Sequence, residues 1–117
     1  VYKRQGKDEQ SAKTILEDAK ALEAAGCDIM LLECVPMDLA KQVTESLAIP
    51  VIGIGAGPDC DGQVLVLHDM LGLTPEKRPR FVQDFFKNTG SINAAVENYV
   101  EAVKSGNFPS QQHSFNS

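Results

Sequence analysis

The spacing of apolar residues predicts that helices and strands alternate along the chain. Between Ser11 and Gly26 the apolar residues recur at helical spacing, and Gly26 supplies a C-terminal stop. The next stretch is continuously apolar from Ile29 to Leu32 and ends in the carboxylate of Glu33. Continuous apolar character is typical of a strand covered on both faces, as in a parallel sheet.

A second helix and strand follow. Pro36 suits the first turn of a helix, where its missing N–H costs nothing. The buried stripe of that helix consists of Leu39, Ala40, Val43 and Leu47. Residues 50–54 then predict a second buried strand, which runs into the loop Gly55-Ala56-Gly57-Pro58.

Three further elements are predicted beyond the glycine loop. Residues 64–67 form a third apolar run, and two helices are predicted through residues 81–86 and 92–103. The link from Ile54 to Val64 is shorter than the dozen or so residues that a parallel crossover usually needs. Either this turn is unusually compressed, or the third run is not a neighbouring parallel strand.

Strands that alternate with helices indicate an α/β fold with a parallel sheet, either open and doubly wound or closed as a (β/α)8 barrel. A barrel takes roughly 250 residues, so 117 residues would hold less than half of one. The chain starts without Met, and we expect it to be a piece of a longer polypeptide. Its expected parts are residues 1–109, a partial barrel, and residues 110–117, a polar tail.

Composition narrows the class of protein. With 43% hydrophobic residues and a net charge of -5, a globular domain is expected rather than a disordered one. No apolar run is long enough for a membrane span. The basic stretch Lys77-Arg78-Pro79-Arg80 is too short for a nucleic-acid-binding surface and is expected to be a solvated helix start. Cys27, Cys34 and Cys60 lack disulfide or zinc spacing, which fits the cytoplasm.

Glu33 is the most informative candidate for chemistry. It would lie at the carboxyl end of a parallel strand, where catalytic groups gather in α/β folds. Burial would raise the pKa of such a carboxyl group, and nearby helix N–H groups would lower it. Glu33 is therefore either a general base, or a structural carboxylate that caps the next helix or pairs with a lysine.

The glycine loop and its acidic neighbours carry weaker signals. The spacing of Gly53, Gly55 and Gly57 could place backbone N–H groups near an anion, but no helix-opening pattern follows, so close backbone packing is at least as well supported. Asp59 and Asp61 lack the rest of a calcium-loop pattern and are expected to be turn residues.

The histidines and phenylalanines are expected to be structural. We expect a structural or supporting role for His68 and Asp69 rather than a catalytic one, because a nucleophile pair cannot be established from order alone. His113 is expected at the surface or in a subunit contact. The aromatic stripe Phe81, Phe85 and Phe86 is interpreted as core or interface.

Several segments together closely resemble the carboxyl-terminal half of the ketopantoate hydroxymethyltransferase (3-methyl-2-oxobutanoate hydroxymethyltransferase) family. The resemblance runs from about Tyr2 to Phe115. Its segments are Tyr2-Lys3-x-Gln5-Gly6, Ala21-Leu22-Glu23-Ala24-Ala25-Gly26, Leu31-Leu32-Glu33-Cys34-Val35-Pro36, Ile49-Pro50-Val51-Ile52-Gly53-Ile54-Gly55-Ala56-Gly57, Asp61-Gly62-Gln63-Val64-Leu65-Val66-Leu67-His68-Asp69 and His113-Ser114-Phe115.

The resemblance implies a (β/α)8 TIM barrel of the phosphoenolpyruvate mutase and isocitrate lyase type, followed by C-terminal helices. On that template the strands that begin near Ile29, Pro50 and Gln63 resemble the sixth, seventh and eighth, and the short seventh connection would explain the compressed link. The implied reaction transfers a hydroxymethyl group from 5,10-methylenetetrahydrofolate to 3-methyl-2-oxobutanoate, giving 2-dehydropantoate in pantothenate and coenzyme A biosynthesis. Family members are homo-decamers.

The position of Glu33 matches the catalytic base of the family, the proton acceptor. The family's Mg2+ ligands lie on earlier strands, so no metal ligand is assigned to this chain, and the folate-contacting residues stay unassigned. We therefore expect the isolated 117 residues to be inactive. Two alternatives stay open: a non-catalytic barrel fragment that serves as an oligomerisation half-module, and another member of the same barrel superfamily, such as a carbon–carbon lyase.

Overall fold

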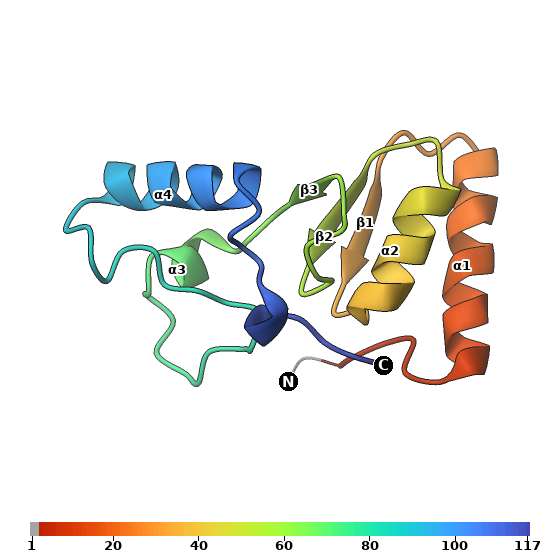
Figure 1. Cartoon of the computed structure of the whole chain (residues 1–117), viewed down its shortest axis with the longest axis horizontal. Helices are drawn as coiled ribbons and strands as arrows, with labels where there is room; N and C mark the ends of the chain where they lie inside the picture. Colours follow the sequence, from red (N-terminus) through yellow and green to blue (C-terminus); the bar gives the residue numbers. More distant parts are fainter. Residues whose placement is uncertain (1–2) are drawn as a thin grey trace.

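A computed structural model of the chain describes residues 3–117, so Tyr2, which opens the first segment of the resemblance, lies outside the described residues. The molecule is elongated, with extents of 44 × 26 × 20 Å. Figure 1 shows a parallel sheet between two groups of helices, with α1 and α2 on one side and α3 and α4 on the other. The expected α/β character is confirmed.

The first helix and strand form where the pattern predicts them. Helix α1 covers Glu9–Ala24 and begins at a capping box formed by Asp8 and Ser11. Gly26 ends it at φ +98°, a conformation that glycine adopts without strain. Strand β1 then covers Met30–Glu33.

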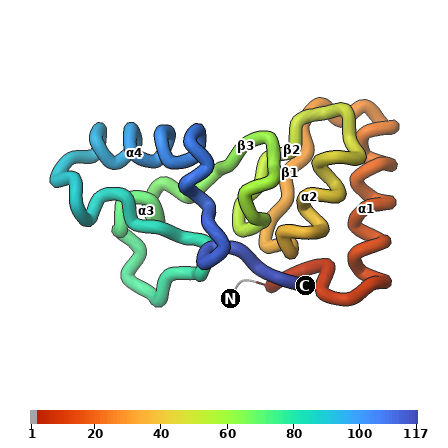
Figure 2. The backbone as a smooth tube through the Cα atoms, in the orientation of Figure 1, coloured from red at the N-terminus to blue at the C-terminus, as the bar shows by residue number. Residues whose placement is uncertain are grey.

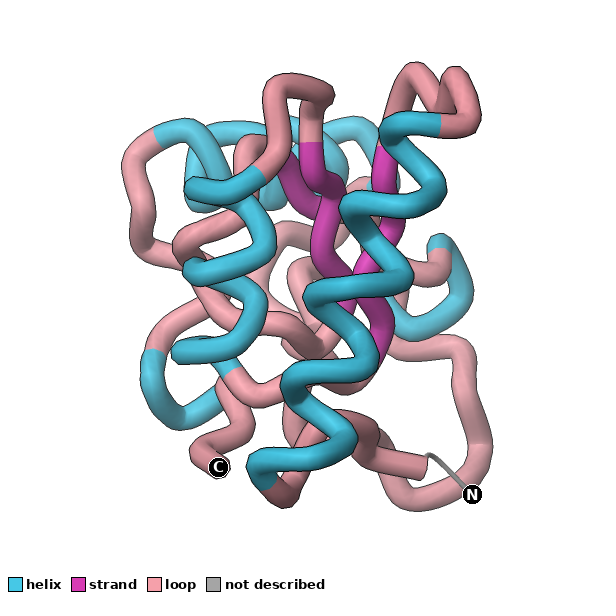
Figure 3. Tube along the Cα trace, turned by 90° about the vertical axis from the view of Figure 1, so that its right-hand side faces the viewer, coloured by secondary structure: helices cyan, strands magenta, loops and turns pink. Residues whose placement is uncertain are grey.

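The second helix and strand also match the prediction. Helix α2 covers Met37–Ser46 and is preceded by Pro36 as its N-cap residue. Strand β2 covers Val51–Ile54 and pairs with β1 in parallel, with Met30 opposite Val51 and Glu33 opposite Ile54. Figure 3 shows α1 and α2 lying across the same face of these strands.

The third strand is shorter than expected and lies slightly earlier. Strand β3 covers Gly62–Gln63 and is a parallel neighbour of β2, so the compressed turn is the correct alternative. The pairing continues only as far as the amide of Val64, which donates to the carbonyl of Gly53 at 3.0 Å. The predicted strand over residues 64–67 is therefore wrong: residues 64–66 are irregular and a short helix, α3 (Leu67–Met70), follows.

The helix predicted through residues 81–86 is also wrong, because that segment consists of turns and irregular chain. Its apolar side chains are buried in two different clusters: Phe81 and Val82 pack beside Ile54, whereas Phe85 packs on α4. Arg78 lies outside any helix and pairs with Asp84 at 3.1 Å, so the expected helix start over residues 77–80 is wrong as well. The expectation that the phenylalanines are core residues is confirmed for Phe81 and Phe85.

The chain ends in a long helix and a packed segment. Helix α4 covers Ile92–Lys104, where apolar spacing predicts it, and its N-cap residue is Ser91. Residues 110–117, here called the C-terminal segment, contain the short 3-10 helix η1 (Gln111–His113) and return to the carboxyl ends of β1 and β2. In Figure 2 this dark blue segment crosses from the α4 side towards α2.

Candidate functional site

Glu33 is the last residue of β1 and lies on the face of the sheet opposite α1 and α2. Met30 and Leu32 are buried in the cluster that contains side chains of both helices, whereas Leu31 and Glu33 are exposed. Successive side chains of a strand point to opposite faces, so Leu31 and Glu33 share the face that no helix of this pair covers. The strand is thus not covered on both faces among the described residues.

The 34–36 loop, Cys34-Val35-Pro36, follows Glu33 and is buried. Cys34 adopts φ +54°, which an L-residue other than glycine rarely does. Its amide donates to the carbonyl of Ile54 at 2.9 Å, and its own carbonyl accepts the amide of Gln5 at 3.0 Å. These two bonds hold the backbone next to Glu33 from both sides.

The environment of the Cys34 thiol keeps it neutral. Burial raises the pKa of this thiol, and the neighbouring Glu33 carboxylate raises it further. Reactive cysteines need the opposite shift, because the thiolate is the nucleophile. Cys34 therefore contributes packing rather than nucleophilic chemistry, which leaves Glu33 as the candidate for chemistry at the end of β1.

The glycine loop is packed and does not form an open anion cradle. Gly55 and Gly57 have φ of +63° and +81°. A Cβ atom on Gly55 would lie 2.8 Å from the ring of Phe81, and one on Gly57 would collide with Met37 at the start of α2. The close-packing interpretation of this loop is confirmed, and the loop brings β2, the 34–36 loop and residue 81 together.

The acidic and histidine candidates are structural where the structure describes their contacts. Asp61 accepts the amide of Val51 at 2.8 Å and so closes the short link between β2 and β3, as expected of a turn residue. Asp69 is buried and accepts the hydroxyl of Thr74. His113 is also buried, so of its two expected positions the one at the surface is wrong, whereas a subunit contact stays a prediction; burial lowers the pKa of His113.

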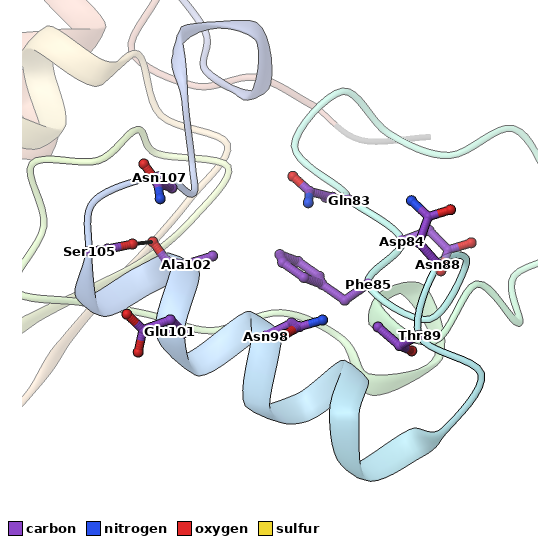
Figure 4. A pocket seen from close by; sticks show the side chains of 10 residues that line it. All are labelled: Gln83, Asp84, Phe85, Asn88, Thr89, Asn98, Glu101, Ala102, Ser105 and Asn107. Atoms are coloured by element: carbon purple, nitrogen blue, oxygen red, sulfur yellow. Dashed lines mark hydrogen bonds between the residues drawn. The ribbon is translucent and has the colours of Figure 1, made fainter.

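Two hollows in the surface lie away from Glu33. A groove of about 380 Å³ beside α4 is rich in carboxamide side chains (Figure 4). Its lining residues are Gln83, Asp84, Phe85, Asn88, Thr89, Asn98, Glu101, Ala102, Ser105 and Asn107. A larger hollow of about 930 Å³ lies between residues 3–8 and the first turns of α1. Neither hollow includes Glu33 in its lining, so the expected chemistry does not lie in either of them.

The described residues do not bring together three or more His, Cys, Asp or Glu side chains that could hold a metal ion. Within residues 3–117, none of the helices is long and apolar enough to cross a membrane. The candidate site is therefore one carboxylate at the end of a strand of a parallel sheet, followed by a loop held by backbone hydrogen bonds.

Sequence reasoning missed the groups that hold this loop. The amide of Gln5 donates to the carbonyl of Cys34 in the loop, and the carbonyl of Phe115 accepts the amide of Met37 directly after it. For Phe115 a signal was present, since it is an isolated large apolar residue in an otherwise polar tail.

Known proteins resemble almost the entire chain. A sequence profile of the ketopantoate hydroxymethyltransferase family matches residues 1–111. A protein of Hahella chejuensis named 3-methyl-2-oxobutanoate hydroxymethyltransferase 2 is 61% identical over 115 residues, which cover 98% of this chain and 44% of that protein. Two further relatives are both named 3-methyl-2-oxobutanoate hydroxymethyltransferase, and each matches 97% of this chain. The protein of Alkalilimnicola ehrlichii is 56% identical, and the match covers 41% of its length. The protein of Erwinia tasmaniensis is 58% identical, and the match covers 43% of its length. The chain thus spans less than half the length of these relatives.

Proposed function

Because the chain belongs to the ketopantoate hydroxymethyltransferase family, we propose that it forms the carboxyl-terminal part of an enzyme that transfers a hydroxymethyl group to 3-methyl-2-oxobutanoate. The donor would be 5,10-methylenetetrahydrofolate and the product 2-dehydropantoate, on the route to pantothenate. The observation that carries the proposal is the position of Glu33, an exposed carboxylate at the carboxyl end of a parallel strand. In α/β folds that edge of the sheet holds the reacting groups.

The arrangement of β1, β2 and β3 supports a (β/α)8 barrel as the complete fold. The three strands are parallel, and α1 and α2 cover one face. Both outer strands have free edges in the described chain, and the opposite face exposes Leu31 beside Glu33. Free edges and exposed apolar strand residues are tolerated poorly in an isolated sheet. Further strands of a closed barrel would pair with the free edges, and their side chains would cover Leu31.

Glu33 would act as the proton acceptor. The C3–H bond of the keto acid lies next to its ketone, so removal of that proton leaves an enolate whose charge is spread onto the ketone oxygen. The proton passes to the Glu33 carboxylate, and the C3 carbon then bonds to the methylene carbon of the folate. Over the whole reaction both C–N bonds to that carbon break, water supplies the hydroxyl oxygen, and the protons from C3 and from the water go to the two folate nitrogens as tetrahydrofolate leaves. A base must lie within hydrogen-bond reach of the proton that it removes, and the exposed position of Glu33 allows a substrate to approach.

The Mg2+ that the resemblance implies does not find a site among the described residues. Magnesium binds oxygen ligands, usually carboxylates, and no cluster of three such groups occurs within residues 3–117. Stabilisation of the enolate would have to come from groups beyond those described.

A chimera tests the proposal. In the Hahella chejuensis relative, the 115 matched residues are replaced by those of this chain, and exchange of the substrate C3 hydrogen with D2O is followed by NMR. We expect the chimera to catalyse exchange and product formation, and the isolated chain to do neither. Replacing Glu33 by Gln removes the base but keeps size and polarity, so exchange should fall by about 10² to 10⁴-fold.

The matched control is Glu45→Gln, which changes an exposed carboxylate on α2. It should leave the exchange rate unchanged. Exchange at the parental rate in the Glu33→Gln chimera would remove Glu33 from the role of proton acceptor. Turnover by the isolated chain would refute the expectation that it is inactive.

We also propose that the complete protein is a homo-oligomer and lies in the cytoplasm. Support for assembly comes from α4, on which Ile92, Val96 and Val100 are exposed at helical spacing. Exposed apolar stripes of this kind mark contact surfaces between chains. The alternative of a non-catalytic oligomerisation module predicts assembly without any hydrogen exchange in the chimera.

A further inference from the structure

The 34–36 loop depends on a distant part of the chain. The amide of Met37, the first residue of α2, donates to the carbonyl of Phe115 at 2.9 Å. A helix leaves its first amides without intrahelical acceptors, and an N-cap side chain usually accepts one of them. Pro36 holds the N-cap position here and has no side chain that can accept, so the Phe115 carbonyl takes over part of that function.

The ring of Phe115 holds this carbonyl in place. It packs edge-to-face on Phe81 with ring centroids 6.3 Å apart, and the guanidinium of Arg4 lies 5.4 Å from its centroid. Phe81 in turn packs directly on Gly55 at the end of β2. The ring thus contacts Phe81, which itself packs on the residue after β2, and Arg4, which precedes α1.

The rest of the C-terminal segment is ordered by its own contacts. The hydroxyl of Ser114 donates to the carbonyl of Ser110 at 2.8 Å, and Ser114 is buried. The ring of His113 lies 5.0 Å from that of Phe108. The residues that precede Phe115 are therefore themselves packed in place, as expected where a residue sets the position of another segment.

We propose that Phe115 is a positioning residue for Glu33. The inference rests on the proposed function, because it assumes that Glu33 removes a proton. Three backbone hydrogen bonds hold the 34–36 loop and its entry into α2, from Ile54, Gln5 and Phe115. The Ile54 bond continues the pairing of β1 with β2, whereas the Phe115 carbonyl belongs to a residue whose own ring packs on Phe81 and under the guanidinium of Arg4. Loss of the ring frees the carbonyl and the start of α2, and Glu33 at the other end of the loop moves from its working position.

The test compares two variants of the same segment in the chimera. Phe115→Ala removes the ring, whereas Asn116→Ala changes an exposed neighbour. A misplacement of about 1 Å costs a reaction up to about 10²-fold in rate, so kcat for C3 hydrogen exchange should fall by about 10- to 100-fold in Phe115→Ala. KM for the keto acid should stay within about twofold, since an interaction that orients the base does not bind the substrate. Phe115→Tyr, which keeps the ring, should restore kcat.

Amide hydrogen exchange gives a second readout that does not depend on catalysis. The Met37 amide should lose protection in Phe115→Ala and keep it in Asn116→Ala. If Phe115→Ala fails to fold, Arg4→Gln takes its place: it removes the cation over the ring at an exposed position and should lower kcat by about two- to fivefold.

The inference is overturned if Phe115→Ala retains the kcat of Asn116→Ala, or if its kcat loss is matched by an equal rise in KM. In the Arg4→Gln fallback, an unchanged kcat overturns it. Failure of the proposed function gives a different result, because Glu33→Gln would then retain exchange. Loss of exchange in Glu33→Gln together with normal kcat in Phe115→Ala would reject the positioning role alone.

Discussion

Replacing Gly57 by alanine should destabilise the fold for two separable reasons, its backbone conformation and a collision of the added Cβ with Met37. Gly57 has φ +81°, and its missing Cβ would lie 3.2 Å from the Cα of Met37 and closer still to the Met37 Cβ. Alanine therefore meets both an unfavourable backbone conformation and a backbone atom that cannot rotate away.

Gly106 supplies the matched control for the backbone part. Its φ of +77° is nearly the same, but nothing lies within 4 Å of the position of a Cβ atom. The left-handed conformation costs an alanine about 1–2 kcal/mol, of which the stiffer unfolded chain returns about 0.4–1 kcal/mol. Gly106→Ala should therefore lower the free energy of unfolding by about 1 kcal/mol.

The collision with Met37 adds to that cost. Overpacking of a packed interior costs typically about 1–3 kcal/mol, so Gly57→Ala should lower the free energy of unfolding by about 2–4 kcal/mol in total. The measurement is urea unfolding of the two variants and the parent, monitored by circular dichroism. The free energies are compared where the dependence on urea concentration is the same for all three proteins. Equal destabilisation by Gly57→Ala and Gly106→Ala would show that the glycine loop is not packed on α2 and would refute the reasoning.

Two further predictions concern groups that hold the termini of elements. Asp61→Ala leaves the amide of the fully buried Val51 without an acceptor, so the free energy of unfolding in urea should fall by about 1–3 kcal/mol. Asp59→Ala changes an exposed neighbour and should leave that free energy unchanged. An equal loss in both variants would contradict the role of the hydrogen bond. Burial lowers the pKa of His113, so the unfolded chain binds a proton first as the pH falls below about 6.5, and the free energy of unfolding should decrease with falling pH in that range. His113→Gln should flatten this pH dependence, whereas His68→Gln, at an exposed position, should not. An unchanged pH dependence in His113→Gln would show that His113 is not its source.

Local pattern was sufficient for elements whose contacts lie close in the chain. Helices α1, α2 and α4 and strands β1 and β2 were all predicted, because apolar spacing, caps and glycine stops act within one element and its neighbours. The position of Glu33 at the end of β1 was predicted for the same reason.

Pattern failed where residues of one short segment pack in different places. Phe81 and Phe85 have helical spacing, but one is buried beside Ile54 and the other against α4, so no helix forms. Asp84 reinforces this result by accepting the amides of Phe86 and Lys87, which stabilises a turn in place of a helix.

The linear order of residues therefore determined the family, the parallel strand and helix units, and the acidic residue that ends β1. Tertiary structure alone decided which face of the sheet Glu33 occupies and which groups hold the loop after it. The carbonyl of Phe115 accepts the first amide of α2, and the ring of the same residue packs with Phe81 and the guanidinium of Arg4, both distant in the chain. Such contacts have no local signature, since their free energy arises only once the chain has brought the segments side by side.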